Sequence, residues 1–149
     1  MSETALTDRQ RRVLALHLDP DGGSKYWLEQ ARQCGICSTS ELVTTGDLLR
    51  FGPMDEQALA TRPYEDFVPA CCLQQRQQLI TAETGGSLGK PKLTVYRQDE
   101  FEAAFVTPFV KAARAKGFPS EGGWLWIGPS GPHIIGKAAR ACATAMGAA

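Results

Sequence analysis

A glycine-rich stretch between two short runs of strand-forming residues constrains the fold of this sequence more than any other feature. The two runs lie at residues 79–81 and 93–96 and read LIT and LTVY, which are rich in β-branched and aromatic residues. Residues 83–92 lie between them and read ETGGSLGKPK. This arrangement predicts two antiparallel strands joined by a long loop.

The residues that follow predict the start of an α/β domain over residues 79–149. Phenylalanines four residues apart within residues 99–116 predict a helix with one apolar face. Residues 124–127, WLWI, predict a buried strand, and the alanine-rich residues 132–146 predict a last helix with Pro132 in its first turn. The order strand, loop, strand, helix, strand, loop, helix is typical of α/β proteins. Because three strands need further elements to cover them, we expect a truncated domain, the N-terminal part of a larger protein.

The first part of the chain, residues 1–78, predicts a helical region. Thr7 with Gln10, and Ser38 with Glu41, have the spacing of a capping box, in which two side chains satisfy free backbone N–H groups at a helix start. Prolines interrupt the later part of this region, and each disfavours helical backbone in the residue before it. We therefore expect helices first and irregular structure after them.

Charge and hydropathy exclude several classes of protein. Sixteen Lys and Arg residues balance sixteen Asp and Glu residues, so the basic excess of a nucleic-acid-binding protein is missing. The sequence contains no apolar run long enough for a membrane span, and its first residues lack the pattern of a signal peptide. We therefore expect a cytoplasmic protein that binds neither nucleic acid nor membranes.

The residue types of the glycine-rich stretch are those of a phosphate-binding loop. Its glycines let backbone N–H groups approach an anion, Thr84 and Ser87 add hydroxyl groups, and Lys90 and Lys92 add positive charge. The stretch is not the Walker A loop of ATPases, because Thr84 stands where the first glycine belongs and Pro91 where a hydroxyl residue belongs. A loop that merely joins two strands is the alternative.

On these residues the sequence resembles the adenylate-forming acid ligases. Residues 84–92, TGGSLGKPK, are similar to the phosphate loop of that family, and only Leu88 departs from a pattern that usually has a small hydroxyl residue there. Residues 126–133, WIGPSGPH, resemble the segment that follows the loop in ligases similar to phenylacetate–CoA ligase. Together with residues 17–20, HLDP, they look closest to the adenylating proteins of phenazine antibiotic biosynthesis.

The resemblance implies a nucleotide-binding domain that converts a carboxylic acid, plausibly aromatic, and ATP into an acyl-adenylate and pyrophosphate. The family uses Mg²⁺, and many members pass the acyl group to coenzyme A or another thiol. Lys92 would neutralise charge as pyrophosphate departs, and His133 would lie beside the acid substrate at the start of a helix. The residues that would hold the phosphates are Thr84, Gly85, Gly86, Ser87, Gly89, Lys90 and Lys92.

Later motifs of the same family are missing from this sequence. The family has an aromatic-Gly-x-Thr-Glu run that meets Mg²⁺ and adenine, an acidic residue on the ribose, and a catalytic lysine near its C-terminus, and we find none of them here. We therefore expect little or no ligase activity from this polypeptide alone. The alternative is a non-catalytic nucleotide-binding or protein-interaction module, in which uncovered apolar surface would favour self-association.

The cysteines leave a third and weaker interpretation open. Cys34 and Cys37 have the spacing of a zinc or redox pair, but Cys71 and Cys72 are adjacent and do not repeat that spacing. An odd count of five cysteines indicates free thiols in a reducing compartment rather than a disulfide framework. We expect no metal site, and Cys142 is expected to be a small core residue.

Overall fold

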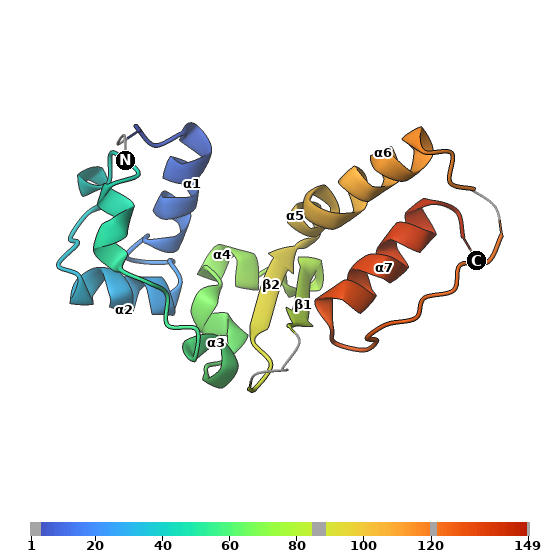
Figure 1. The fold of residues 1–149 in the computed structure, drawn as a ribbon. Coiled ribbons are helices and arrows are strands. Elements are labelled where there is room, and N and C mark those ends of the chain that lie inside the picture. The colour runs from blue at the N-terminus through green and yellow to red at the C-terminus, as the bar shows by residue number, and fades with distance from the viewer. Residues whose placement is uncertain (1–3, 85–88, 120–121, 149) are drawn as a thin grey trace. The chain divides into compact units, whose positions relative to one another are not determined.

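The computed structural model describes residues 4–84, 89–119 and 122–148, and the chain divides into two compact units (Figure 1). Unit 1 is Met1–Arg76 and unit 2 is Gln77–Ala149. Among the described residues, no helix combines the length and the apolar character that crossing a bilayer requires.

Unit 1 consists of helices and helical turns. Thr7 caps the first helix in the predicted capping box with Gln10, which confirms that prediction. The box of Ser38 and Glu41 is also present, but it begins a single 3₁₀ turn rather than an α-helix. In chain order the elements are α1 (Asp8–His17), α2 (Lys25–Gln33), η1 (Thr39–Glu41), η2 (Asp47–Phe51), α3 (Ala58–Thr61), η3 (Tyr64–Phe67) and α4 (Ala70–Leu73), and η4 (Arg76–Gln78) spans the boundary between the units.

The turn between α1 and α2 is closely packed around Gly23. A Cβ atom on this residue would lie 2.4 Å from the carbonyl oxygen of His17, so the position has no space for a side chain. Ser24 follows, is completely buried, and joins its Oγ to Nδ1 of His17 over 2.9 Å. These contacts end α1 and begin α2 in a fixed geometry.

Two clusters hold unit 1 together. The first is aliphatic and consists of Leu6, Ala31, Ile36 and Leu42, with Leu14, Leu18, Cys34, Leu48 and Phe51 packed around them. The second surrounds Tyr26, whose ring is 1% exposed and lies 4.9 Å from the ring of Phe67. Arg62 stacks on the same ring and pairs with Glu29 and Asp66, each at 2.7 Å, which joins α2 to η3.

Unit 2 begins with the predicted hairpin. The strands β1 (Leu79–Glu83) and β2 (Leu93–Arg97) pair antiparallel, with Leu79 opposite Arg97 and Glu83 opposite Leu93. Three helical elements, α5 (Gln98–Phe101), η5 (Glu102–Val106) and α6 (Thr107–Ala115), then follow without a break, and α7 (Ile134–Ala145) is the last helix (Figure 1).

The helix expected over residues 99–116 is present, but η5 within it is a turn of π-helix. We attribute the wider turn to Pro108. Proline has no N–H to donate to the carbonyl of Ala104, and its ring would collide with that carbonyl in a regular α-helix. A π turn just before such a residue relieves the conflict without ending the helix.

Two sequence-based predictions about the second half are wrong. Residues 124–127 form no strand, and Leu125 and Ile127 are 86% and 87% exposed. Trp126 instead bends back, with its Nε1 donating to the carbonyl oxygen of Pro129 over 3.0 Å. The described residues therefore hold one two-stranded antiparallel sheet among helices, which agrees with a mixed α/β class but not with the expected third strand. Pro132 also lies outside α7, because His133 is its N-cap.

The core of unit 2 forms where α7 packs against η5 and β1. Phe101 is buried to 2% exposure, and its ring and that of Phe105 both lie edge-on to Tyr96 of β2. Cys142 is buried as predicted, and its thiol donates to the carbonyl oxygen of Phe105 over 3.7 Å. Burial raises the pKa of the Cys142 thiol above its usual value.

Candidate functional site

The predicted phosphate loop is closed at its base by Thr84 and Lys92. The N–H of Thr84 donates to the carbonyl oxygen of Lys92 over 2.9 Å, and the N–H of Lys92 donates to Oγ1 of Thr84 over 3.2 Å. These bonds extend the β1–β2 ladder by one residue pair. The two ends of the loop are therefore held side by side, as a cradle for an anion requires.

Toward the part of the chain that the structure describes, the O–H of Thr84 donates no hydrogen bond, so this donor is open to a ligand. A hydroxyl group has two acceptor lone pairs and one O–H donor, and the Lys92 N–H uses one lone pair only. Sequence alone indicated only that Thr84 could meet a phosphate. The structure adds a second role, which is to fix the backbone at the position where Lys92 leaves the loop.

The other predicted loop residues are described only in part. Gly85, Gly86 and Ser87 lie outside the described residues, together with Leu88. Gly89 has φ +154°, a conformation that L-residues rarely adopt, and Lys90 is exposed. The structure thus brings Thr84 and Lys92 together and leaves the roles of the remaining loop residues as predictions.

His133 lies next to the base of this loop. It forms a parallel bridge with Glu83, and the N–H of Glu83 donates to the carbonyl oxygen of Pro132 over 2.8 Å. The Nδ1 atom of His133 is buried and has no hydrogen-bond partner among the described residues. This histidine is therefore placed one residue away from Thr84, at the start of α7, with a ring nitrogen able to take a further bond.

Lys137, one turn into α7, secures the same edge of β1. Its Nζ donates to the carbonyl oxygen of Thr81, which occupies a backbone acceptor that faces away from β2. Gly136 allows the chain before α7 to approach the helix, since a Cβ there would lie 2.5 Å from the carbonyl oxygen of Pro129. The start of α7 is thus fixed against both β1 and the preceding loop.

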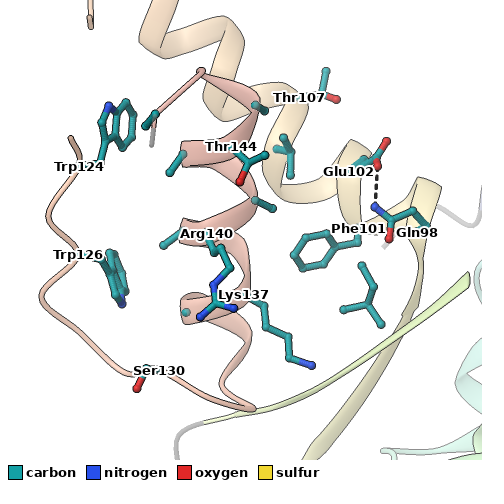
Figure 2. Close-up of a pocket in the computed structure, with 18 of the residues that line it drawn as sticks. Gln98, Phe101, Glu102, Thr107, Trp124, Trp126, Ser130, Lys137, Arg140 and Thr144 are labelled. Carbon is teal, nitrogen blue, oxygen red and sulfur yellow. Dashed lines mark hydrogen bonds between the residues drawn. The ribbon is translucent and has the colours of Figure 1, made fainter. Parts of the chain in front are cut away.

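A groove of about 1020 Å³ opens around α7, and its lining residues all belong to unit 2. Figure 2 shows the rings of Trp124 and Trp126 on one side of this helix and Phe101 on the other. The floor is made of the small side chains of α7, most of them alanine. The groove therefore offers flat aromatic walls over a shallow apolar floor.

Two cations of α7, Lys137 and Arg140, reach this groove (Figure 2). Lys137 is bonded to the carbonyl oxygen of Thr81, whereas Arg140 is exposed and makes no hydrogen bond or ion pair with another described residue. Sequence reasoning missed both residues. Their spacing of three positions on an alanine-rich helix, which places them on one face, was the available signal.

The cysteines do not form a metal centre within the described part of the chain. No group of three or more His, Cys, Asp or Glu side chains is arranged there to hold a metal ion. All five cysteines are described and none is in a disulfide. The spacing of Cys34 and Cys37 is therefore not accompanied by further ligands in this region of the structure.

Comparison with known proteins does not assign the chain to a family. No model of a protein family matches it, and no curated protein matches it either. The function proposed below therefore rests on the residues of the loop and on the geometry around it.

Proposed function

We propose that residues 79–149 are the phosphate-binding part of an adenylate-forming acid ligase, which joins a carboxylic acid to AMP and releases pyrophosphate. The observation that carries this proposal is the closed base of the loop. Thr84 and Lys92 are bonded to each other at the end of a two-stranded ladder, and His133 lies beside them. The sequence resemblance of residues 84–92 to the phosphate loop of that family supports the same conclusion.

In this proposal the loop binds the β- and γ-phosphates. The glycines bring N–H groups to the phosphate oxygens, the Thr84 hydroxyl donates a hydrogen bond to them, and Lys90 adds positive charge. Lys92 stands at the end of the loop and stabilises the negative charge that grows on pyrophosphate as the bond to the α-phosphorus breaks. A carboxylate oxygen of the acid forms the new bond to that phosphorus.

The described residues fit Mg²⁺ only as an ion held mainly by the nucleotide. They contain no cluster of three metal-binding side chains, and Mg²⁺ commonly takes most of its ligands from phosphate oxygens and water. When bound, the ion supplies further neutralisation of the phosphate charge. The residues of the loop position the nucleotide and donate hydrogen bonds to its phosphate oxygens.

The proposal places the acid substrate near His133 and the groove around α7. Its flat walls, Trp124 and Trp126, suit an aromatic ring, and Arg140 suits a carboxylate. Transfer of the acyl group to coenzyme A or another thiol would be the second step of such a reaction. Because none of the described cysteines is in a disulfide, a reducing cytoplasmic setting agrees with this proposal.

A second candidate is a non-catalytic module that binds a nucleotide or a protein. The exposure of Leu125 and Ile127, two large apolar side chains in one short segment, favours it. Self-association of the chain through this segment would be its simplest form.

The test compares ligands that differ in their phosphates. Calorimetric titration of the purified chain with Mg-ATP, Mg-pyrophosphate and AMP should give binding of the first two and much weaker binding of AMP, because the loop recognises the phosphate tail. We expect no ATP–pyrophosphate exchange with any aryl acid, since the later motifs are missing. Equal affinity for AMP would contradict a phosphate loop. Sedimentation that shows self-association without nucleotide binding would instead support the interaction module.

A further inference from the structure

Two consecutive cysteines on unit 1, outside the predicted phosphate loop, have their thiols close together. Cys71 and Cys72 are the second and third residues of α4, and their Sγ atoms are 4.0 Å apart. Cys71 is exposed and Cys72 is half-buried. The N–H of Ala70 donates to the carbonyl oxygen of Gly22 over 2.8 Å, which fixes the start of this short helix.

A disulfide between these thiols would be strained. Consecutive Cα atoms across a trans peptide lie about 3.8 Å apart, whereas the Cα atoms of disulfide-bonded cysteines usually lie about 4.4–6.8 Å apart. The sulfur atoms would also have to approach to about 2.0 Å, half of their present separation. The geometry therefore disfavours oxidation of Cys71 and Cys72 to a disulfide.

The same separation suits two bonds to one bridging atom. Two sulfur bonds of about 2.3 Å that meet at about 90–110° place the sulfur atoms about 3.3–3.8 Å apart, far closer to the observed 4.0 Å than the length of a disulfide bond is. The described residues offer no third His, Cys, Asp or Glu ligand in a cluster with this pair. The atom that bridges the two sulfurs must therefore be one that prefers thiolate ligands and needs no more than two of them from the protein.

We propose that Cys71 and Cys72 form a chelating dithiol site for trivalent arsenic compounds that carry one organic group. Such an arsenic centre has three bonds, of which carbon takes one and the two sulfurs take the others. With an aryl arsenic oxide, both S–H bonds break, two arsenic–sulfur bonds form, and the oxygen leaves with both protons as one water molecule. The arsenic stays trivalent throughout, so the step needs no oxidant or reductant.

The test uses phenylarsine oxide on the full chain, with intact-mass measurement under non-denaturing conditions. The wild type should gain one phenylarsenic group that survives an excess of glutathione, a monothiol, and is removed by dithiothreitol, a dithiol. Cys71→Ser and Cys72→Ser should each lose the glutathione-resistant adduct. Cys34→Ser and Cys37→Ser are the matched controls, because they remove thiols at the other closely spaced pair and should retain the adduct.

Three results would overturn the proposal. These are an adduct on the wild type that glutathione removes, an adduct that survives in both Cys71→Ser and Cys72→Ser, and an adduct that is lost in the Cys34→Ser or Cys37→Ser controls. Circular dichroism spectra of the variants that match the wild type would show that a lost adduct does not reflect unfolding. All four variants exchange one sulfur atom for oxygen, and each pair contains one exposed and one half-buried cysteine, so the two sets are matched in exposure.

Discussion

Glu83 and His133 lie side by side in a parallel bridge, with the N–H of Glu83 bonded to the carbonyl oxygen of Pro132. This bridge brings the start of α7 to the strand that leads into the glycine-rich loop. His133, whose Nδ1 is buried, thereby lies beside the residue that precedes Thr84, although the two are far apart in sequence. The candidate site depends on this junction between β1 and the start of α7.

Gly136→Ala should destabilise unit 2. The added Cβ would lie 2.5 Å from the carbonyl oxygen of Pro129, so either α7 or the loop before it must move. Overpacking of this kind costs about 1–3 kcal/mol in the free energy of unfolding, which urea unfolding followed by circular dichroism would measure. Gly123→Ala is the control, since a Cβ there meets no described atom within 4 Å, and it should leave the midpoint nearly unchanged.

Gly23→Ala should destabilise unit 1 in a similar way. Its Cβ would lie 2.4 Å from the carbonyl oxygen of His17 and 2.6 Å from that of Asp19, both of them backbone atoms that cannot swing aside. The neighbouring Gly22→Ala is the matched control, because its closest contact would be an ordinary 3.5 Å. Thermal unfolding should show a clear loss for the first variant only. An equal loss of thermal stability in both variants would contradict this account, because it would mean that the space around the added Cβ does not decide the effect.

Arg62→Ala should lower the stability of unit 1 by about 1.5–3 kcal/mol, because it removes the nearer of the two cations that pair with the buried Asp66 and leaves only Lys25 at 3.7 Å. Arg62 pairs with Glu29 and with the buried Asp66, and it also stacks on Tyr26. Arg76→Ala is the control, since its ion pair with Glu65 is exposed and such pairs contribute about 0–1 kcal/mol. Denaturant unfolding would compare the two variants, and equal losses would contradict a central role for Arg62.

Acid should destabilise unit 1 partly through Asp47. Its carboxylate accepts hydrogen bonds from the N–H groups of Thr44 and Val43 at 2.7 and 2.9 Å, and these bonds lower its pKa below the usual 3.8. A lowered folded-state pKa gives stability that is present above the ordinary carboxyl pKa and is lost as the pH falls through the lowered value. Asp47→Asn should therefore unfold more easily at neutral pH and lose less stability on acidification. A wild-type pH dependence in the variant would contradict this account.

Local signals predicted the parts of the fold that they control. The Thr7 and Gln10 capping box involves residues three apart, and the β1–β2 hairpin joins neighbouring runs, so both could be recognised from sequence. The strand predicted at residues 124–127 is absent because a strand needs a partner to pair with. The sequence of these four residues does not indicate whether such a partner is present. The π turn was missed because Pro108 was not considered within an otherwise regular helical pattern.

Some residues of the candidate site could be predicted from the sequence, and others could not. The sequence placed Thr84 and Lys92 in one loop, but only the structure reveals their mutual hydrogen bonds. Lys137 and Arg140 were missed because their importance depends on where α7 packs, which is a tertiary feature. Long-range contacts of this kind leave no periodic signal in the residues themselves.

The most direct test of the central claim is the affinity of the chain for Mg-ATP in the variant Lys92→Ala. A contact from a charged group contributes about 1.5–3 kcal/mol, so calorimetric titration should show an affinity weaker than that of the wild type by about 10- to 100-fold. Lys111→Ala removes the same charge from an exposed position on α6 and should bind as the wild type does. Equal affinities for Lys92→Ala and the wild type, or no measurable binding by the wild type, would contradict a phosphate loop at residues 84–92.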